Sequence, residues 1–475
     1  MSLKQQTANA LGWNLIDRIG TQAAYLVTGI VLARLLPVSD FGLIGMLSIF
    51  VGLSTILVDG GFSSALIRKQ GATDRDYNTL FYLNMGVSIF LYLLLFAATP
   101  AIARFYSQPQ LIPLARVLFL GIIINSAALI QSTLFTKQIN FKVQVITNTT
   151  SLLIAGGSAI ALAYNGAGAW ALVFQTLILS FCKTLTLWIV SSWRPKMIFS
   201  WESLKSVLGY SSNLLASQIV NTLFVNLYTL TIGRLFSVAE VGYYTQAQKM
   251  NDMATSVLNN PIQAATFPIF STIQDDRERL LRAFRKTMRF AMFVTFLALP
   301  MLLLVARPFM LFLLGDKWSH SVPYLQLILI GSIFNLITAL VNSFLRIPGR
   351  TDVLLRLEFA KVLLSVVILI FTIPYGSLAV IGGLVISRVI ICITNMYISS
   401  RYIDYTFGMQ VKDILPYAGL SVISFVAAWP ISQVLEGNFW LLATQCSTYS
   451  IIFFTLAWLF NSKVLVDVIS TLKRS

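Results

Sequence analysis

The sequence predicts an all-α membrane protein of about fourteen transmembrane helices, arranged as two pseudo-symmetric six-helix lobes and a C-terminal helix pair. The first observation behind this prediction is composition: hydrophobic residues make up 57% of the 475 residues, and charged residues make up only 11%. A soluble protein carries roughly 25% charged residues, so a single water-soluble core does not fit. The second observation is an internal repeat, and the third is the distribution of positive charge between apolar segments.

A short pattern occurs twice at one constant offset along the chain. Residues 32–42 read LARLLPVSDFG and residues 232–242 read IGRLFSVAEVG, with an arginine, a leucine, a valine, an acidic residue and a glycine at matching places. Each copy ends one long apolar segment and begins another, so the repeated element is a helical hairpin within a larger lobe. Duplicated membrane lobes are how transporters enclose a cavity that opens alternately to either side.

The repeated arginines, Arg34 and Arg234, are interpreted as structural. Each falls in the last turn of its predicted helix, where a positive charge complements the helix dipole. Asp40 and Glu240 then begin the next helix, where a negative charge is favourable. The repeated glycines would allow close packing of the hairpin.

Fourteen apolar stretches are long enough to cross a bilayer, which takes about 20 residues. The first lobe, residues 1–200, is predicted to hold spans at 11–36, 42–67, 79–99, 114–136, 143–165 and 169–191. The second lobe, residues 201–400, is predicted to hold spans at 211–235, 242–272, 287–305, 323–345, 357–375 and 378–400. The last part, residues 401–475, holds a peripheral helix pair at 414–435 and 439–461.

Positive residues determine the predicted orientation. With the N-terminus in the cytoplasm, the inner loops hold most of the cations, including the cluster from Arg277 to Arg289, and the outer side holds few. This asymmetry follows the positive-inside rule for short loops. An even number of spans then places both termini in the cytoplasm, and it relates the two lobes by an axis along the membrane normal.

Polar side chains inside predicted spans give the candidate site, because each ionisable group costs about 2.5–3.5 kcal/mol at mid-bilayer on insertion scales. In the first span a polar stripe contains Asn14, Arg18, Thr21, Tyr25 and Thr28, with Asp17 beside Arg18. In the eighth span a broad polar face contains Gln246, Lys249, Asp252, Ser256, Asn259, Asn260 and Gln263. We expect both faces to line a wet cavity, because a polar face is unstable against lipid.

The charges inside the spans are mostly positive. The predicted substrate-binding residues are Arg18, Lys249, Arg388 and Lys183. Asp17 and Asp252 are expected to pair with the cation next to each, which leaves a surplus of positive charge suited to an anionic group such as a pyrophosphate. A structural alternative stays open, since such pairs also hold helices together and Lys183 can extend its amine to the inner interface.

Two carboxylates are candidates for ion coupling. Asp59 and Asp252 could each carry a proton or a sodium ion across the membrane. Asp59 lies beside Gly60 and Gly61, a break in the helical pattern, so a local helix-capping role is an equal alternative for this residue.

Several classes of chemistry do not fit the sequence. His320 is the only histidine, and Cys182, Cys392 and Cys446 lie in apolar segments without metal-ligand or disulfide spacing. The chain has no Walker-type phosphate loop and no acidic pair in an outer loop for glycosyl chemistry. We expect no catalytic residues, no metal, no cofactor and no enzymatic activity. Nucleic-acid binding is not expected despite the net charge of +16, because the cations lie in short gaps between apolar runs.

Four segments resemble a known family: Gly12–Trp13, 33–42, 59–67 and Gly242–Tyr244. With these segments the chain resembles the polysaccharide-transport flippases (Wzx-type, colanic-acid or teichuronic-acid exporter branch) of the multidrug/oligosaccharidyl-lipid/polysaccharide exporter superfamily. The resemblance spans essentially the whole length. It implies two six-helix lobes and a helix pair, in a multi-pass protein of the bacterial inner membrane. Members are similar in having cationic central cavities.

The resemblance also implies a function. The expected activity is movement of undecaprenyl-pyrophosphate-linked oligosaccharide from the inner to the outer leaflet by alternating access, in lipopolysaccharide, O-antigen or exopolysaccharide biosynthesis. The expected partners are this lipid-linked substrate and membrane lipids, with a polysaccharide polymerase and glycosyltransferases as candidates. The alternative is a multidrug or small-molecule cation antiporter of the same superfamily, which would favour a more acidic or aromatic cavity.

Overall fold

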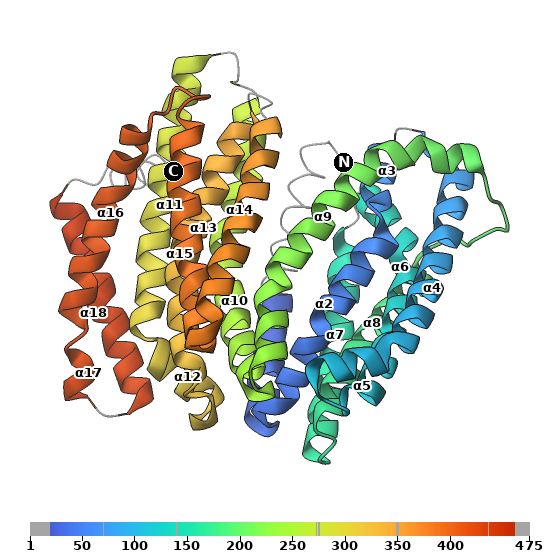
Figure 1. The fold of residues 1–475 in the computed structure, drawn as a ribbon. Helices are drawn as coiled ribbons and strands as arrows, with labels where there is room; N and C mark the ends of the chain where they lie inside the picture. Colours follow the sequence, from blue (N-terminus) through green and yellow to red (C-terminus); the bar gives the residue numbers. More distant parts are fainter. Residues whose placement is uncertain are drawn as a thin grey trace. The chain divides into compact units, whose positions relative to one another are not determined.

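The computed structural model describes residues 20–69, 71–138, 141–271, 273, 276–347, 351–435 and 437–460. Within these ranges all regular structure is helical, and no strand is present. The chain divides into two compact units, Met1–Thr245 and Gln246–Ser475, which are called unit 1 and unit 2 below. Figure 1 shows the helices coloured along the sequence.

The described part of unit 1 starts with the helical residues 20–35 and continues through α2 (Val38–Asp59), α3 (Phe62–Arg68), α4 (Asp74–Tyr106), α5 (Leu111–Leu118), α6 (Leu120–Lys137), α7 (Phe141–Tyr164), α8 (Ala169–Val190) and α9 (Trp201–Leu235). The next helix, α10 (Val238–Ser271), begins in unit 1 and ends in unit 2. Unit 2 continues through α11 (Arg277–Leu304), α12 (Ala306–Leu314), η1 (Asp316–Trp318), α13 (Ser321–Arg346), α14 (Thr351–Thr372), η2 (Ile373–Tyr375), α15 (Ser377–Ser399), α16 (Phe407–Ala428), α17 (Ile431–Val434) and α18 (Asn438–Leu459).

The predicted all-α membrane fold is confirmed. Helices cover the described part of every predicted span, and the predicted break in the second span separates α2 from α3 at Gly60 and Gly61, both in the left-handed region. Among the described residues, eleven helices are long and apolar enough to cross a membrane. The total of fourteen spans stays a prediction.

The boundary between the units falls inside α10 rather than at the predicted lobe boundary near residue 200. The reason is packing: α9 lies against α2, α3 and α4 of unit 1. The division into residues 1–200, 201–400 and 401–475 follows from the sequence duplication, and it stays a proposal about how the chain is organised.

The helices pack in the same order in the two units. In unit 1, α4 packs on α6, α6 packs on α8, and α7 packs on α8. In unit 2, the corresponding order is α11 on α13, α13 on α15, and α14 on α15. A short helix also follows the first helix of each series: α5 follows α4, and α12 follows α11. This repeated order is what a duplicated lobe predicts.

The two copies of the repeated pattern contact each other within unit 1. A Cβ atom on Gly42 would overlap the carbonyl oxygen of Val238, and a Cβ atom on Gly242 would overlap the carbonyl oxygen of Val38. Because each position contacts the other copy in the same way, the contact has the reciprocity of a local two-fold. The glycines were predicted to serve packing of the hairpin, and the structure places their closest approach between the two hairpins.

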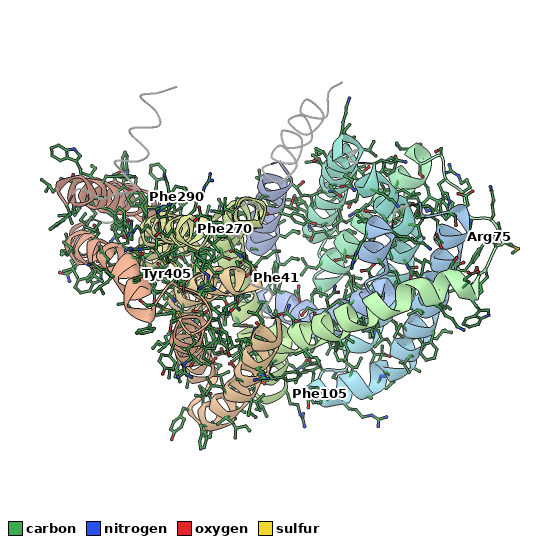
Figure 2. All side chains as sticks on the ribbon, turned by 90° about the horizontal axis from the view of Figure 1, so that it is seen from above. Phe41, Arg75, Phe105, Phe270, Phe290 and Tyr405 are labelled. Carbon is green, nitrogen blue, oxygen red and sulfur yellow. The ribbon has the colours of Figure 1, made fainter. Side chains whose placement is uncertain are left out.

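The predicted positions of the repeated charges at helix ends are confirmed. Arg234 lies in the last turn of α9, while Asp40 and Glu240 lie in the first turns of α2 and α10. The Nη1 atom of Arg234 donates a hydrogen bond of 2.6 Å to the carbonyl oxygen of Phe105. Its guanidinium carbon lies 5.3 Å from the centre of the Phe105 ring, which is labelled in Figure 2.

A buried carboxylate on α16 joins the C-terminal helices to the rest of unit 2, where α16 packs on both α11 and α18 (Figure 1). Asp413 accepts hydrogen bonds from Nε and Nη2 of Arg285 at 2.8 and 3.1 Å, and from Nε of Arg289 at 2.7 Å. The hydroxyl of the fully buried Tyr405 (Figure 2) donates to the same carboxylate at 3.0 Å. Burial raises the pKa of Tyr405, and the negative charge of Asp413 raises that pKa further, so the phenol stays protonated and can donate.

Candidate functional site

The polar stripe of the first span lies partly outside the described residues. The residues outside are Asn14, Asp17 and Arg18. Thr21 and Tyr25 lie on the helical residues 20–35, with the Tyr25 side chain exposed. Thr28 is buried, and a Cβ atom on Gly156 of α7 would lie 2.6 Å from its Oγ1 atom. The C-terminal end of the predicted stripe, at Thr28, therefore packs against α7.

The polar face of the eighth span is formed on α10, in unit 2. Spacing of three and four residues places Gln246, Lys249, Asp252 and Ser256 along one side of this helix. Gln246 is buried, whereas the side chains of Lys249 and Asp252 are exposed at the surface of the helix. The hydroxyl of Ser256 donates to the carbonyl oxygen of Met253 at 2.9 Å, within the helix itself.

Asp252 has different partners from the one predicted. Its Oδ1 atom accepts hydrogen bonds from the side-chain amides of Gln248 at 2.6 Å and Asn251 at 3.3 Å. No salt bridge joins Asp252 to Lys249 in the part of the chain that the structure describes, and the positive charge acting on the carboxylate comes from Arg388. The predicted local pairing with Lys249 is therefore wrong, and the ammonium group of Lys249 has no ion pair among the residues that the structure describes.

Arg388 lies on α15, and its side chain extends toward α13. Its Nη1 atom lies 3.4 Å from the hydroxyl oxygen of Ser332 on α13, at the outer limit of a hydrogen bond. That hydroxyl donates to Oδ1 of Asn251 on α10 at 2.8 Å. A chain of three polar side chains thus connects α15, α13 and α10, and it holds the guanidinium near Asp252.

A glycine on α13 makes room for the arginine. A Cβ atom on Gly331 would lie 3.1 Å from Cδ and 3.2 Å from Nη1 of Arg388, closer than ordinary van der Waals contact. The aliphatic part of the arginine therefore lies against bare helix backbone. This close packing limits the positions that the guanidinium can adopt, which favours a defined binding geometry.

The resulting charge balance is positive. Lys249 and Arg388 bring two positive charges, and Asp252 brings one negative charge. A guanidinium can bind two oxygens of a phosphate at once, and an ammonium acts as a compact point charge. We name Lys249, Asp252 and Arg388 the α10 charge cluster. Its surplus of positive charge is suited to an anion.

Two other predicted site residues lie in unit 1. Oδ1 of Asp59 accepts hydrogen bonds from the backbone nitrogen of Ser63 at 3.3 Å and from its hydroxyl at 2.5 Å, so this carboxylate caps α3. The hydroxyl of Thr133 on α6 donates to Ser63 at 3.2 Å. Lys183 is half-buried on α8. Ion coupling by Asp59 and substrate binding by Lys183 stay predictions.

Sequence reasoning missed three residues around the cluster. Asn251 lies beside the polar face that periodicity selected, and Ser332 and Gly331 lie within an apolar helix. The only available signal was a glycine–serine pair in an otherwise apolar run. Among the described residues, no group of three histidine, cysteine or acidic side chains could hold a metal ion.

A duplicated set of apolar helices with charged side chains on one helix face defines a class, the multi-pass membrane transporter. Residues 31–323 match the family described as polysaccharide biosynthesis protein, and the chain belongs to that family. The resemblance seen in the sequence is thereby confirmed. The protein is a multi-pass protein of the bacterial inner membrane.

Curated relatives extend over most of the chain. The lipopolysaccharide biosynthesis protein WzxC of Escherichia coli (strain K12) is 26% identical over 92% of this chain and 90% of its own length. The teichuronic acid biosynthesis protein TuaB of Bacillus subtilis (strain 168) is 26% identical over 89% of each chain. The succinoglycan biosynthesis transport protein ExoT of Rhizobium meliloti (strain 1021) is 25% identical over 88% of this chain and 82% of its own length.

Solved structures share the fold. The lipid II flippase MurJ in an inward closed conformation superposes with a TM-score of 0.78 at 14% identity, covering 96% of this chain and 100% of its own. An inward-facing multidrug resistance MATE family transporter of the MOP superfamily gives a TM-score of 0.63 at 18% identity, covering 84% of this chain and 99% of its own. At these identities the similarity concerns the fold alone.

Proposed function

We propose that this protein is a flippase that moves an undecaprenyl-pyrophosphate-linked oligosaccharide from the inner to the outer leaflet of the bacterial inner membrane. The observation that carries the proposal is the α10 charge cluster, in a chain of the polysaccharide biosynthesis family. Its two cations and single carboxylate favour an anionic cargo. A carrier of cationic drugs would need the opposite balance of charge.

The names of the relatives support recognition of the lipid carrier rather than of the sugar. They refer to three different polysaccharides: lipopolysaccharide, teichuronic acid and succinoglycan. A family that serves such different glycans needs a common element in its substrates, and the pyrophosphate on an isoprenoid lipid is such an element. Lys249 and Arg388 would contact that group.

The proposed mechanism is alternating access. The pyrophosphate and glycan enter a cavity open to the cytoplasm, while the isoprenoid tail stays in the bilayer. Movement of the two lobes then opens the cavity to the other side. No bond is made or broken in the cargo, so the chain acts as a transporter and not as an enzyme. Glycosyltransferases would supply the substrate, and a polymerase would consume the product.

The energy source is one of two. Ion antiport could use a carboxylate, with Asp252 beside the cations or Asp59 at the end of α2 as the groups that titrate. Alternatively, the polymerase would consume the lipid-linked oligosaccharide in the outer leaflet, and this removal would favour net outward transport without a coupling ion. With both termini in the cytoplasm, as the charge distribution predicts, glycosyltransferases would deliver the substrate from the same side.

Reconstitution tests the proposal. The purified full-length protein in proteoliposomes should accelerate movement of a fluorescent undecaprenyl-pyrophosphate-linked oligosaccharide between leaflets, measured by quenching with a membrane-impermeant reductant. Vesicles without protein and a neutral glycolipid with the same glycan are the matched controls, and neither should show acceleration. Efflux of a cationic dye without movement of the lipid would overturn the proposal and assign the chain to the cation antiporters.

A further inference from the structure

A cavity in unit 2 lies apart from the α10 charge cluster. It has a volume of about 600 Å³ and is formed by α11, α16 and the C-terminal end of α18. Arg285 and Arg289 of α11 and Lys412 of α16 supply positive charge to its lining. The proposed transport reaction uses none of these residues.

The cavity holds more positive than negative charge. Among the described residues, Asp413 is the only acidic residue in its lining, and it already accepts hydrogen bonds from both arginines and Tyr405. Lys412 is exposed, and it has no hydrogen bond or salt bridge to any residue in the described part of the chain. Three cations against one carboxylate leave a surplus of two positive charges. One phosphodiester group would halve that surplus, and two would balance it.

The rest of the lining is apolar. Leu420 and Ile423 continue along α16 from the charged end, and Phe460 closes the cavity from the end of α18. Ile423 is exposed on a helix that is long and apolar enough to cross the membrane. The site therefore combines a cationic end with an apolar groove, which fits an amphipathic anion better than a free inorganic one.

The cations of the cavity lie close to the ends of their helices, as binding of a lipid headgroup would require. At 1.5 Å per residue, Lys412 lies about 8 Å from the start of α16, and Arg285 lies about 12 Å from the start of α11. These helix ends belong to the side that charge distribution predicts to be cytoplasmic. For helices that begin at the aqueous edge of the headgroup layer, cations at this depth would lie near the boundary between headgroups and hydrocarbon.

We propose that this cavity binds an anionic phospholipid of the inner leaflet. The phosphodiester contacts Lys412 and the outer faces of Arg285 and Arg289, and one acyl chain lies along Leu420 and Ile423. Basic pockets between transmembrane helices on the cytoplasmic side bind such headgroups. The lipid would brace α16 and α18 against α11, where Asp413 already joins them. The inference does not depend on the proposed cargo.

Lipid binding to the full-length protein tests the inference. The protein in detergent, titrated with phosphatidylglycerol and followed by native mass spectrometry, should bind it in preference to phosphatidylcholine of the same acyl chains. Lys412→Gln should weaken phosphatidylglycerol binding about fivefold, the value for one cation near a membrane surface. Arg282→Gln removes an exposed cation of α11 outside the cavity, and it should leave binding unchanged.

A substitution that fills the cavity distinguishes lipid binding inside it from non-specific attraction to positive surface charge. Gly419 lines the cavity, and a Cβ atom there would meet nothing within 4 Å, so Gly419→Leu should fill the groove without disturbing the fold. It should lower phosphatidylglycerol binding, whereas Gly408→Leu on the same helix outside the cavity should not. Equal binding of the two phospholipids, or unchanged binding in Lys412→Gln and Gly419→Leu, would overturn the inference. Competition by inorganic phosphate or by the lipid-linked oligosaccharide would also overturn it, by assigning the cavity to a free anion or to the cargo.

Discussion

Gly42→Ala and Gly242→Ala are each expected to lower the free energy of unfolding by about 1–3 kcal/mol, the cost of overpacking a close contact. The added methyl group would overlap a backbone carbonyl oxygen in both cases, Val238 for the first glycine and Val38 for the second. A backbone atom cannot move aside by rotating a side chain, so the two hairpins must separate. Thermal unfolding of the purified variants measures the loss.

Two glycines elsewhere in the helices serve as controls. A Cβ atom at Gly157 of α7 or at Gly382 of α15 would meet nothing within 4 Å. Alanine at these positions should be neutral or stabilising, since glycine costs roughly 0.5–1 kcal/mol relative to alanine inside a helix. If Gly42→Ala and Gly242→Ala unfold at the same temperature as the wild type, the hairpins do not approach as closely as described.

Arg388→Ala is expected to reduce glycan export at least tenfold while leaving the amount of protein in the membrane unchanged. A charge-assisted hydrogen bond is worth about 1.5–3 kcal/mol, and 1.4 kcal/mol corresponds to a tenfold effect. Arg388→Lys should restore export only in part, because an ammonium keeps the charge but not the forked geometry. Export is measured in a strain that lacks its own copy of the gene.

The surroundings of Arg388 provide an independent check on this result. Gly331→Val should also reduce export, since its side chain would occupy the space of the arginine. Arg75→Gln should export normally, because Arg75 is an exposed cation near the start of α4 and far along the chain from the cluster. Normal export from Arg388→Ala would remove this arginine from substrate binding.

Much of the fold could be predicted from the sequence because hydrophobic length and turn residues are local signals. The break at Gly60 and Gly61 and the helix-end charges at Arg234 and Glu240 lie where the pattern placed them. The contact between Gly42 and Val238 could not be predicted, since it depends on how two distant hairpins approach. The packing of α9 against α2 is a tertiary property of the same kind.

The candidate site could be predicted only in part. Helical spacing selected Lys249 and Asp252, and membrane burial selected Arg388, because a charge inside an apolar run is costly in lipid. Which charges meet was not predictable, and Asp252 was assigned to Lys249 although the charge of Arg388 acts on it. The role of Ser332 as a bridge depends on the side-by-side packing of α13 and α15, which leaves no periodic trace in the sequence.

Protection of Lys249→Cys by substrate tests the central claim most directly. The variant is made in a chain whose three native cysteines are replaced, and it is exposed to a charged, membrane-impermeant thiol reagent in proteoliposomes. A water-filled, anion-binding site predicts rapid modification that slows when undecaprenyl-pyrophosphate-linked oligosaccharide is added, and that a neutral glycolipid does not slow. A thiol that stays unmodified, or one that reacts at the same rate with and without the pyrophosphate lipid, would contradict the account.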